Sequence, residues 1–315
     1  MSVLPAIADS GKFGKLLADA DAWLPVVALL REKHDLDEEF TQSSIGSVAV
    51  FLSRSWCIKL HPPLAADLES CELEVAVLRH LNRDGAARLP VATPAIVAEG
   101  TVEGWAYFVA TRLPGEPIED VWPTTPPTVR VELARQLGEC VRAMHDLPLE
   151  SLVRFAIPWK AFRDEQRGRC LDQESDLEPA RMAELEAFLE LGDDRPAPEF
   201  EPALLHTELG PGHVLVQDGT ISGLIDFGDA MIGDPEYDFA AVGLFVTRGD
   251  KRAFSAFSQS YGGNADPVER ASRTLRHALL HKYGTLSWYL KMLEPPALPL
   301  AELADHWFGV AAAPN

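Results

Sequence analysis

The sequence predicts an α+β protein with a strand-rich first part and a mainly helical second part. Two observations support this prediction. β-Branched and aromatic residues group within the first 113 residues, whereas helical spacing of apolar residues dominates after a proline-containing connection at residues 114–127. With 315 residues, of which 47% are hydrophobic, the chain is long enough to bury a sizeable core in one large domain or in two lobes.

The pattern of the first part predicts a small mixed lobe of strands around one helix. Apolar residues before residue 40 recur at helical spacing. The next stretch carries β-branched and aromatic residues on both sides of a polar turn at Ser53 and Arg54, which indicates a hairpin. The predicted elements are, in order, a helical segment within residues 1–40, a hairpin at 47–60, a helix at 67–81 and strands at 95–98 and 105–113.

The second part begins where Pro114 and Gly115 end the last of these strands. We therefore predict a lobe boundary at Arg112, with an N-terminal lobe of residues 1–112 that carries a helical extension and a C-terminal lobe of residues 113–315. The elements predicted for the C-terminal lobe are a helix at 129–145, a loop at 193–202, strands between residues 204 and 227, and otherwise helices.

The composition argues against several classes of partner. The formal charge of −20 argues against a nucleic-acid partner, which requires a basic face, and favours a cationic substrate, although solubility alone explains the charge equally well. No run of about 18 apolar residues and no secretory signal is present, so we expect no membrane partner and a cytoplasmic location. The four cysteines lack the paired spacing of a zinc or redox site and are expected to be reduced core thiols.

The most informative segment spans residues 204–241. Two apolar stretches, HVLV and GLIDF, flank the turn signal Gln217-Asp218-Gly219 and predict a second hairpin. Glu208 precedes the first strand and Asp226 lies near the end of the second, so we expect both carboxylates at the same end of the hairpin. Phosphoryl transfer requires two such carboxylates beside a nucleotide. One orients or deprotonates the attacking hydroxyl, and the other holds magnesium on the phosphates.

This segment resembles the catalytic and metal-binding loops of the aminoglycoside phosphotransferase family, which is related to protein kinases. The family pattern is H-G-D-L-x-x-x-N, followed by I-D-F/W and then by G-D-P-x-Y-D-L-A. The resemblance implies a bilobal protein-kinase-like fold, in which Asp226 is the magnesium ligand, His206 organises the catalytic loop and Asp234 braces it. The residues that match are His206, Leu209, Ile225, Asp226, Phe227, Gly233, Asp234, Pro235, Tyr237, Asp238 and Ala240.

Two departures from the pattern fall on positions that matter for catalysis. Glu208 replaces the catalytic aspartate, and its extra methylene requires a shift of roughly 1 Å, which costs about 10²-fold in rate if the backbone does not absorb it. His213 replaces the metal-binding asparagine, although magnesium prefers oxygen ligands and imidazole suits softer metals. We expect either a single metal held mainly by Asp226, or His213 as a hydrogen-bond donor to phosphate oxygens.

The resemblance also implies a lysine–glutamate pair in the N-terminal, nucleotide-binding lobe. Lys59 lies in the apolar strand CIKL and resembles the strand lysine that contacts nucleotide phosphates. Glu74 stands four and seven residues before Leu78 and Leu81, which places it on the inward face of its helix and makes it the predicted partner. The alternatives are an edge-strand lysine that reaches solvent and a solvated helix glutamate.

Further nucleotide contacts are predicted from two loops. Ser44 lies in the loop at residues 42–47, which offers backbone amides and hydroxyls to phosphates, with a plain turn as the alternative. The segment FVATRLPGE resembles the hinge between the lobes, and the resemblance implies that backbone groups near Arg112 and Leu113 meet the purine ring.

Acceptor contacts are predicted in the last third of the chain, at Glu236, Asp238 and Trp288. The alternative for each is an ordinary surface or packing role, because a packed helix produces the same spacings. His145 is expected to be a packing residue and not a catalyst.

The resemblance implies an enzyme that moves the γ-phosphate of ATP or GTP to a hydroxyl of a small molecule, with Mg²⁺ as cofactor. The acidic composition favours a cationic acceptor such as an aminoglycoside or a related antibiotic, and hence antibiotic resistance. Small-metabolite kinases share the pattern and stay open as an alternative. The replacements at Glu208 and His213 favour a second alternative, a non-catalytic nucleotide-binding pseudokinase. A purely structural interaction protein is the third.

Overall fold

The computed structural model describes residues 3–5, 7, 10–43, 46–83, 89–191, 200–263 and 265–311. The chain divides into two units. Unit 1 comprises Met1–Ala86, Ala92–Pro114 and Gly223–Asp229, and unit 2 comprises Ala87–Val91, Gly115–Ser222 and Ala230–Asn315. The break after Pro114 lies close to the lobe boundary predicted at Arg112. The segment Gly223–Asp229 also belongs to unit 1, and this return of the chain was not predicted.

Unit 1 is built on an antiparallel five-stranded sheet with strand order β1-β2-β3-β5-β4. The predicted hairpin, the helix after it and the next two strands are confirmed, whereas β1 was not predicted. The elements of unit 1 are α1 (Ser10–Leu17), a 3₁₀ helix (Ala20–Trp23), α2 (Leu24–Lys33), β1 (Thr41–Gln42), β2 (Ala49–Leu52), β3 (Trp56–His61), α3 (Ala65–Arg83), β4 (Ile96–Val102) and β5 (Trp105–Thr111).

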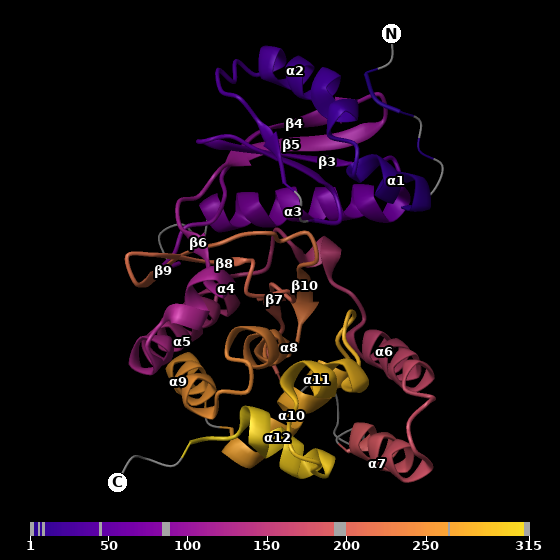
Figure 1. Cartoon of the computed structure of the whole chain (residues 1–315), viewed down its shortest axis with the longest axis vertical. Helices are drawn as coiled ribbons and strands as arrows, with labels where there is room; N and C mark the ends of the chain where they lie inside the picture. Colours follow the sequence, from indigo (N-terminus) through magenta and orange to yellow (C-terminus); the bar gives the residue numbers. More distant parts are fainter. Residues whose placement is uncertain are drawn as a thin grey trace. The chain divides into compact units, whose positions relative to one another are not determined.

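The sheet of unit 1 lies between the N-terminal helices on one face and α3 on the other (Figure 1). Successive side chains of a strand point to opposite faces, so Ile58 and Leu60 of β3 share one face and Lys59 takes the other. Ile58 and Leu60 are fully buried in an apolar cluster that includes Trp23. Lys59 therefore points toward α3, the helix that carries Glu74.

Unit 2 is mainly helical, as predicted, and contains two small sheets, of order β10-β7 and β6-β8-β9 (Figure 1). The four cysteines of the chain are free thiols, and three of them are buried. In the part of the chain that the structure describes, no helix is long and apolar enough to cross a membrane.

The helices and strands of unit 2, with the last residues of β9 in unit 1, have the following bounds. The strands are β6 (Glu116–Pro117), β7 (Ala203–Leu205), β8 (Val214–Gln217), β9 (Thr220–Leu224) and β10 (Met231–Gly233). The helices are α4 (Ile118–Val121), α5 (Pro127–His145), α6 (Trp159–Gln173), α7 (Pro179–Glu190), α8 (Tyr237–Ala241), a π-helix (Val242–Val246), α9 (Lys251–Tyr261), α10 (Pro267–Leu279), α11 (Leu286–Leu293) and α12 (Leu300–Phe308), with 3₁₀ turns at Trp122–Thr124 and Val153–Phe155. The loop predicted at 193–202 lies largely outside the described residues.

The hairpin of β8 and β9 forms at the predicted turn. Asp218 and Gly219 have φ angles of 51° and 76°, the left-handed conformation that a two-residue hairpin turn needs and that Asp-Gly adopts at low cost. β9 ends at Leu224, so the prediction that the strand continues through GLIDF is wrong. Asp226 has a φ of 66°, which is incompatible with a strand, and its side chain bonds to Lys59.

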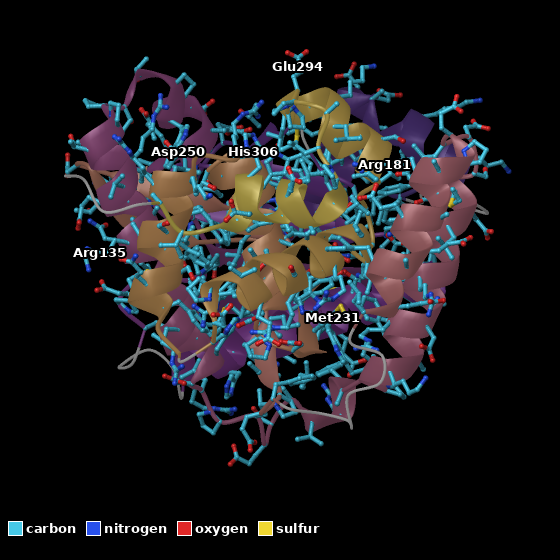
Figure 2. The ribbon with its side chains drawn as sticks, turned by 90° about the horizontal axis from the view of Figure 1, so that it is seen from below. Arg135, Arg181, Met231, Asp250, Glu294 and His306 are labelled. Carbon is cyan, nitrogen blue, oxygen red and sulfur yellow. The ribbon has the colours of Figure 1, made fainter. Side chains whose placement is uncertain are left out.

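Acidic caps fix the start of two helices in unit 2. The Asp250 carboxylate accepts hydrogen bonds from the backbone N–H groups of Arg252 and Ala253, and Asp266 caps α10 in the same way. Figure 2 shows Asp250 at the start of α9, with Arg135 of α5 and Arg181 of α7 on opposite sides of the helices. Capping by Asp266 fixes the residue at which α10 starts, and the helical repeat then determines which of its side chains share one face.

Candidate active site

Three charged side chains meet in unit 1. The Lys59 ammonium donates to both carboxylate oxygens of Glu74, at 2.7 and 3.0 Å, and to Oδ1 of Asp226 at 2.7 Å. The side chains of Lys59 and Glu74 are 10% and 3% exposed, whereas that of Asp226 is 39% exposed. Strand β3, helix α3 and the segment after β9 each supply one member. The structure thus brings together three residues that the sequence predicts for nucleotide and metal binding.

The electrostatics of this cluster follow from burial and from the two carboxylates. Burial alone lowers the pKa of Lys59, but Glu74 and Asp226 together raise it above its ordinary value, so the ammonium stays charged. Burial raises the pKa of Glu74, and the Lys59 ammonium opposes that shift. When all three groups are ionised, two negative charges share one positive charge. The excess negative charge resides beside solvent at Asp226, the more exposed carboxylate.

The segment that carries Asp226 is bound to α3 at two further points. The backbone N–H of Phe227 donates to Glu74 at 3.3 Å, and the Ser70 hydroxyl donates to the carbonyl of Gly228 at 2.8 Å. A Cβ at Gly228 would lie 3.1 Å from the Ser70 hydroxyl, which is tighter than ordinary contact. The close approach of this segment to α3 therefore explains why it belongs to unit 1.

The donor set of this cluster fits a magnesium ion that is carried in by a nucleotide. Mg²⁺ in such sites is held by one or two carboxylates and by substrate phosphates, not by a preformed protein cage. Among the described residues no group of three or more His, Cys, Asp and Glu side chains is arranged to hold a metal. Asp226 offers a partly exposed carboxylate with one oxygen bonded to Lys59. That arrangement suits a metal whose other ligands come from the nucleotide.

The predicted hinge residues, Arg112 and Leu113, directly follow β5. The backbone N–H of Arg112 donates to the carbonyl of Ser55 at 2.8 Å, and its guanidinium donates to the carbonyl of Ser53 at 2.7 Å. The backbone N–H of Arg112 is therefore already hydrogen-bonded to the turn between β2 and β3. Leu113, the next residue, is half-buried and belongs to no strand. Ser44, predicted to contact phosphates, lies outside the described residues.

The catalytic-loop residues lie together in unit 2. Nδ1 of His213 lies 2.8 Å from the Glu208 carbonyl, and since a carbonyl only accepts, this nitrogen carries the proton in the neutral ring. His206 is fully buried, and its ring stacks on that of His213 with centroids 5.9 Å apart. The Glu208 residue itself is half-buried. Glu208 and Asp226 belong to different units, so the convergence expected of their carboxylates stays a prediction.

Asp238 binds the backbone of the catalytic loop. Its carboxylate is fully buried and accepts hydrogen bonds from the N–H groups of His206 at 2.9 Å and Thr207 at 2.7 Å. His145 of α5 lies 3.1 Å from the same carboxylate, which gives this expected packing residue a polar role. The loop-bracing contact expected of Asp234 is therefore made by Asp238. A carboxylate so enclosed has no surface for a substrate, so the acceptor contact expected of Asp238 does not fit this geometry.

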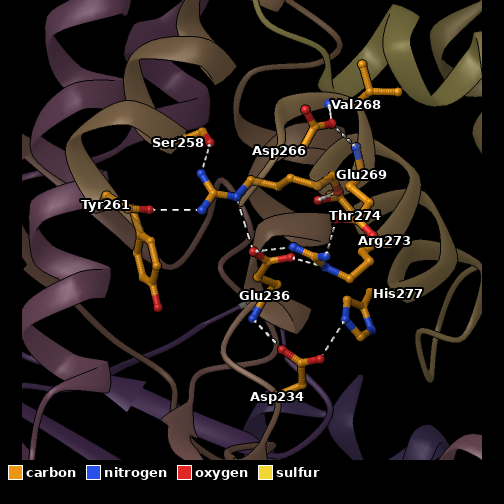
Figure 3. Close-up of polar contacts among 12 residues, drawn as sticks. Asp234, Glu236, Ser258, Tyr261, Asp266, Val268, Glu269, Arg273, Thr274 and His277 are labelled. Carbon is orange, nitrogen blue, oxygen red and sulfur yellow. Dashed lines mark hydrogen bonds and ion pairs between the residues drawn. The ribbon is translucent and has the colours of Figure 1, made fainter. Parts of the chain in front are cut away.

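The carboxylate of Glu236 forms ion pairs with two arginines of α10 and accepts their hydrogen bonds (Figure 3). Nε of Arg270 donates to it at 3.1 Å, and Arg273 donates through two nitrogens at 2.8 and 3.1 Å. Oδ1 of Asp234 accepts the backbone N–H of Glu236 at 3.0 Å, and its other oxygen lies 3.2 Å from Nε2 of His277. Two guanidinium groups thus neutralise Glu236, a geometry that does not favour the acceptor contact expected from the sequence.

Trp288 is the one residue of the three predicted acceptor contacts with substantial exposure. Its side chain lies on α11 and the residue is 46% exposed. The ring packs against Phe245 and Tyr289 with centroids 5.5 Å away in each case. An exposed indole supported from below by two aromatic rings presents a flat surface to a ligand.

Three comparisons relate the chain to known proteins. Residues 47–273 match the model of the phosphotransferase enzyme family. Over 164 residues the chain is 32% identical to viomycin phosphotransferase of Streptomyces vinaceus, a match that covers 48% of this chain and 55% of that relative. It therefore spans little more than half the length of the curated relative.

Two solved structures are similar over most of their length. The GDP complex of wild-type aminoglycoside 2′-phosphotransferase-IIIa has a TM-score of 0.70 at 19% identity, covering 89% of this chain and 97% of the other. Macrolide 2′-phosphotransferase MphH from Brachybacterium faecium has a TM-score of 0.61 at 22% identity, covering 92% and 100%. At these identities the structures show the kinase-like fold alone. Because the family model covers well over half of the sequence, the chain belongs to the phosphotransferase enzyme family.

Proposed function

We propose that the protein transfers the γ-phosphoryl group of ATP or GTP to a hydroxyl of a small cationic molecule, an aminoglycoside or a related antibiotic, and so confers resistance. The observation that carries the proposal is the buried Lys59, bonded at 2.7 Å both to Glu74 and to the more exposed Asp226. The likeness to a relative named for viomycin and to structures named for aminoglycosides and macrolides supports the choice of acceptor class.

In this proposal unit 1 binds the donor nucleotide. Lys59 contacts the phosphates, Glu74 holds Lys59 in place, and Asp226 is the carboxylate that holds the metal. Magnesium, when bound, neutralises charge that develops on the transferring phosphoryl group. Backbone groups at Leu113 and the loop that contains Ser44 complete the nucleotide site.

Unit 2 acts on the acceptor. Glu208 accepts the proton of the attacking hydroxyl, the acceptor oxygen forms its bond to the γ-phosphorus, and the bond from that phosphorus to the nucleoside diphosphate breaks. His206 and His213 hold the loop that carries Glu208. His213 also stands at the metal-binding position of the family pattern, where it acts either as a metal ligand or as a hydrogen-bond donor to phosphate. Trp288 offers the acceptor an aromatic surface, while Glu236 and Asp238 keep the loops in place.

The charge of the chain favours a cationic acceptor. A formal charge of −20 creates a negative potential that raises the encounter rate of amine-rich molecules over that of anions. We also propose a cytoplasmic location, because the nucleoside triphosphate donor is supplied there.

A non-catalytic nucleotide-binding protein is the second candidate. It is favoured by the simultaneous replacement of the catalytic aspartate by Glu208 and of the metal-binding asparagine by His213. Such a protein binds nucleotide through Lys59 and Asp226 but forms no product.

The test is nucleotide turnover with ATP and with GTP across a panel of aminoglycosides, macrolides and peptide antibiotics, with the phosphorylated product detected by mass spectrometry. We expect product from the wild type and loss of it in Glu208→Ala and Asp226→Ala. Glu201→Ala, at an exposed position, is the matched control and should retain activity. Tight nucleotide binding without product from any acceptor would support the binding-only candidate instead.

A further inference from the structure

Thr207 adopts a backbone conformation that a β-branched residue rarely takes. Its φ is 65°, in the left-handed region, where Cβ crowds the following carbonyl. The family pattern has glycine at this position of the catalytic loop, and glycine carries no such cost. Thr207 is the residue directly before Glu208, so its backbone conformation sets the direction in which the Glu208 side chain leaves the loop. A strained conformation persists only where the surroundings impose it.

Hydrogen bonds from two sides impose this conformation. The backbone N–H of Thr207 donates to Oδ1 of Asp238 at 2.7 Å, and Nε2 of His281 lies 3.0 Å from the Thr207 carbonyl oxygen. Thr207 is 1% exposed and His281 is 4% exposed, so neither contact is weakened by competing water. The peptide groups on both sides of the Thr207 Cα are thus held by side chains from distant parts of the sequence.

The contacts of His281 select one form of its ring. A carbonyl only accepts, so Nε2 must carry a proton to bind Thr207. The backbone N–H of Tyr283 points at Nδ1 at 3.4 Å, which requires a lone pair there. One neutral tautomer satisfies both contacts. Burial lowers the pKa of His281, which keeps the ring neutral.

His281 is itself fixed from two sides. Its ring stacks on Tyr237 with centroids 5.4 Å apart and an interplanar angle of 12°. Its carbonyl accepts a hydrogen bond from the guanidinium of Arg169 on α6. A donor held this firmly constrains the atom it contacts, because little freedom of the ring is left to absorb a shift.

His281 follows the end of α10 and is the last of a series of side chains on one face of this helix. Arg270, Arg273 and His277 follow each other at helical spacing, and His281 continues the spacing just beyond the helix end. The first three bond to Glu236 and Asp234 (Figure 3), and the fourth reaches the catalytic loop. His281 lies outside residues 47–273, the part of the chain that matches the family model.

We propose that His281 is a positioning residue of the phosphotransfer site, which holds the left-handed backbone at Thr207 and thereby aims Glu208 at the acceptor. This inference rests on the proposed function. It assigns no contact with substrate to His281. The side chain acts through the loop alone.

The activity test compares two replacements of His281 that differ only in the donor. Gln places its amide nitrogen near the position of Nε2, whereas Leu fills the space without a donor. We expect His281→Leu to lower kcat by about 10²-fold with KM for nucleotide nearly unchanged, and His281→Gln to restore most of kcat. Equal activity of the Leu and Gln variants, or a loss carried by KM, would overturn the proposal.

A second comparison uses the glycine of the family pattern. In a Thr207→Gly background the loop no longer needs to be forced into the left-handed region, so His281→Leu should lower kcat by a distinctly smaller factor than in the wild type. The same factor in both backgrounds would contradict the proposed role. Comparing His281→Leu in the two backgrounds also separates a positioning role from a general loss of folding. Thr207→Gly would not restore activity that was lost because the protein failed to fold.

One readout does not depend on activity. Long-range ¹⁵N–¹H spectra of the wild type at neutral pH should show His281 as the neutral tautomer with the proton on Nε2, and Asp238→Asn should leave that tautomer in place. A proton on Nδ1 would overturn the inference. If no acceptor is phosphorylated but this tautomer is found, then the proposed function fails while the contact to Thr207 stands.

Discussion

The two units hold their functional groups in different ways. In unit 1 the predicted site residues hold each other: the Lys59 ammonium bonds to both Glu74 and Asp226, and removing it would leave the buried Glu74 carboxylate without that cation. In unit 2 the side chains that hold the loop are separate from the proposed catalytic residue, because Asp238 and His281 bind the backbone of the loop that carries Glu208. Substitutions in unit 1 should therefore change stability and function together, whereas unit 2 should allow the two to be separated.

The largest effect on stability is expected from the buried pair of unit 1. Glu74→Ala removes the more buried of the two carboxylates that Lys59 contacts, and breaking a buried pair costs up to about 3–5 kcal/mol. Urea unfolding measures the change in the free energy of unfolding. Glu72→Ala, at an exposed position on the same helix α3, is the control and should change it by less than about 0.5 kcal/mol. Similar costs for both variants would mean that the cluster is not a buried ionic contact.

The next expected effect is a loss of catalytic activity without a loss of stability. Glu208→Gln keeps the shape of the side chain but removes the proton acceptor, so kcat should fall by about 10²-fold or more while the free energy of unfolding stays nearly constant. Glu208→Asp, which restores the residue of the family pattern, should retain activity. Steady-state kinetics with the best acceptor provide the measurement. Full activity in Glu208→Gln would remove Glu208 from its proposed role.

A smaller effect is expected at Thr207. Replacement of a buried threonine by glycine normally destabilises a protein, but glycine relieves left-handed strain worth about 1–3 kcal/mol. Thr247 is an equally buried threonine with a φ of −82°, so it provides the matched control. Thr207→Gly should be less destabilising than Thr247→Gly by about 1 kcal/mol, as measured by urea unfolding. Equal costs would mean that the Thr207 backbone is unstrained.

The smallest effect is a pH dependence in unit 2. Burial raises the pKa of Asp234, but the neighbouring His277 and the N–H of Glu236 outweigh it, and the pKa lies below its ordinary value of 3.8. A lowered pKa in the folded state gives stability that is present above pH 3.8 and is lost as the pH falls through the folded-state value. The advantage of the wild type over Asp234→Asn should therefore shrink at acidic pH. A stability difference between the wild type and Asp234→Asn that stays constant across the acidic range would contradict the lowered pKa of Asp234.

Much of unit 1 was predictable because its signals are local. The resemblance implied that a strand lysine pairs with a helix glutamate, and the phase of Glu74 relative to Leu78 and Leu81 selected Glu74 as the partner. The structure brings Lys59 and Glu74 together. The Asp-Gly turn of the second hairpin was predictable for the same reason, since two adjacent residues determine its conformation.

The rest of the candidate site depends on tertiary contacts that no spacing reveals. The end of β9 at Leu224 follows from the bond between Asp226 and Lys59, residues 167 positions apart. Asp234 and Asp238 are four residues apart in one motif, and only the fold decides that Asp238 reaches the catalytic loop. The helical spacing from Arg270 to His281 was visible in the sequence, but nothing there indicated which face of the helix met the loop.

Calorimetric titration of Mg²⁺ and a non-hydrolysable nucleotide into Asp226→Asn and Glu208→Gln tests the roles proposed for the two carboxylates. Asp218→Asn, a change at another left-handed aspartate in an exposed turn, is the control. We predict that Asp226→Asn weakens nucleotide binding by at least about 10-fold, whereas Glu208→Gln and the control leave it within about 2-fold. Unchanged binding in Asp226→Asn, or an equal loss in Glu208→Gln, would contradict the division of roles between the two carboxylates.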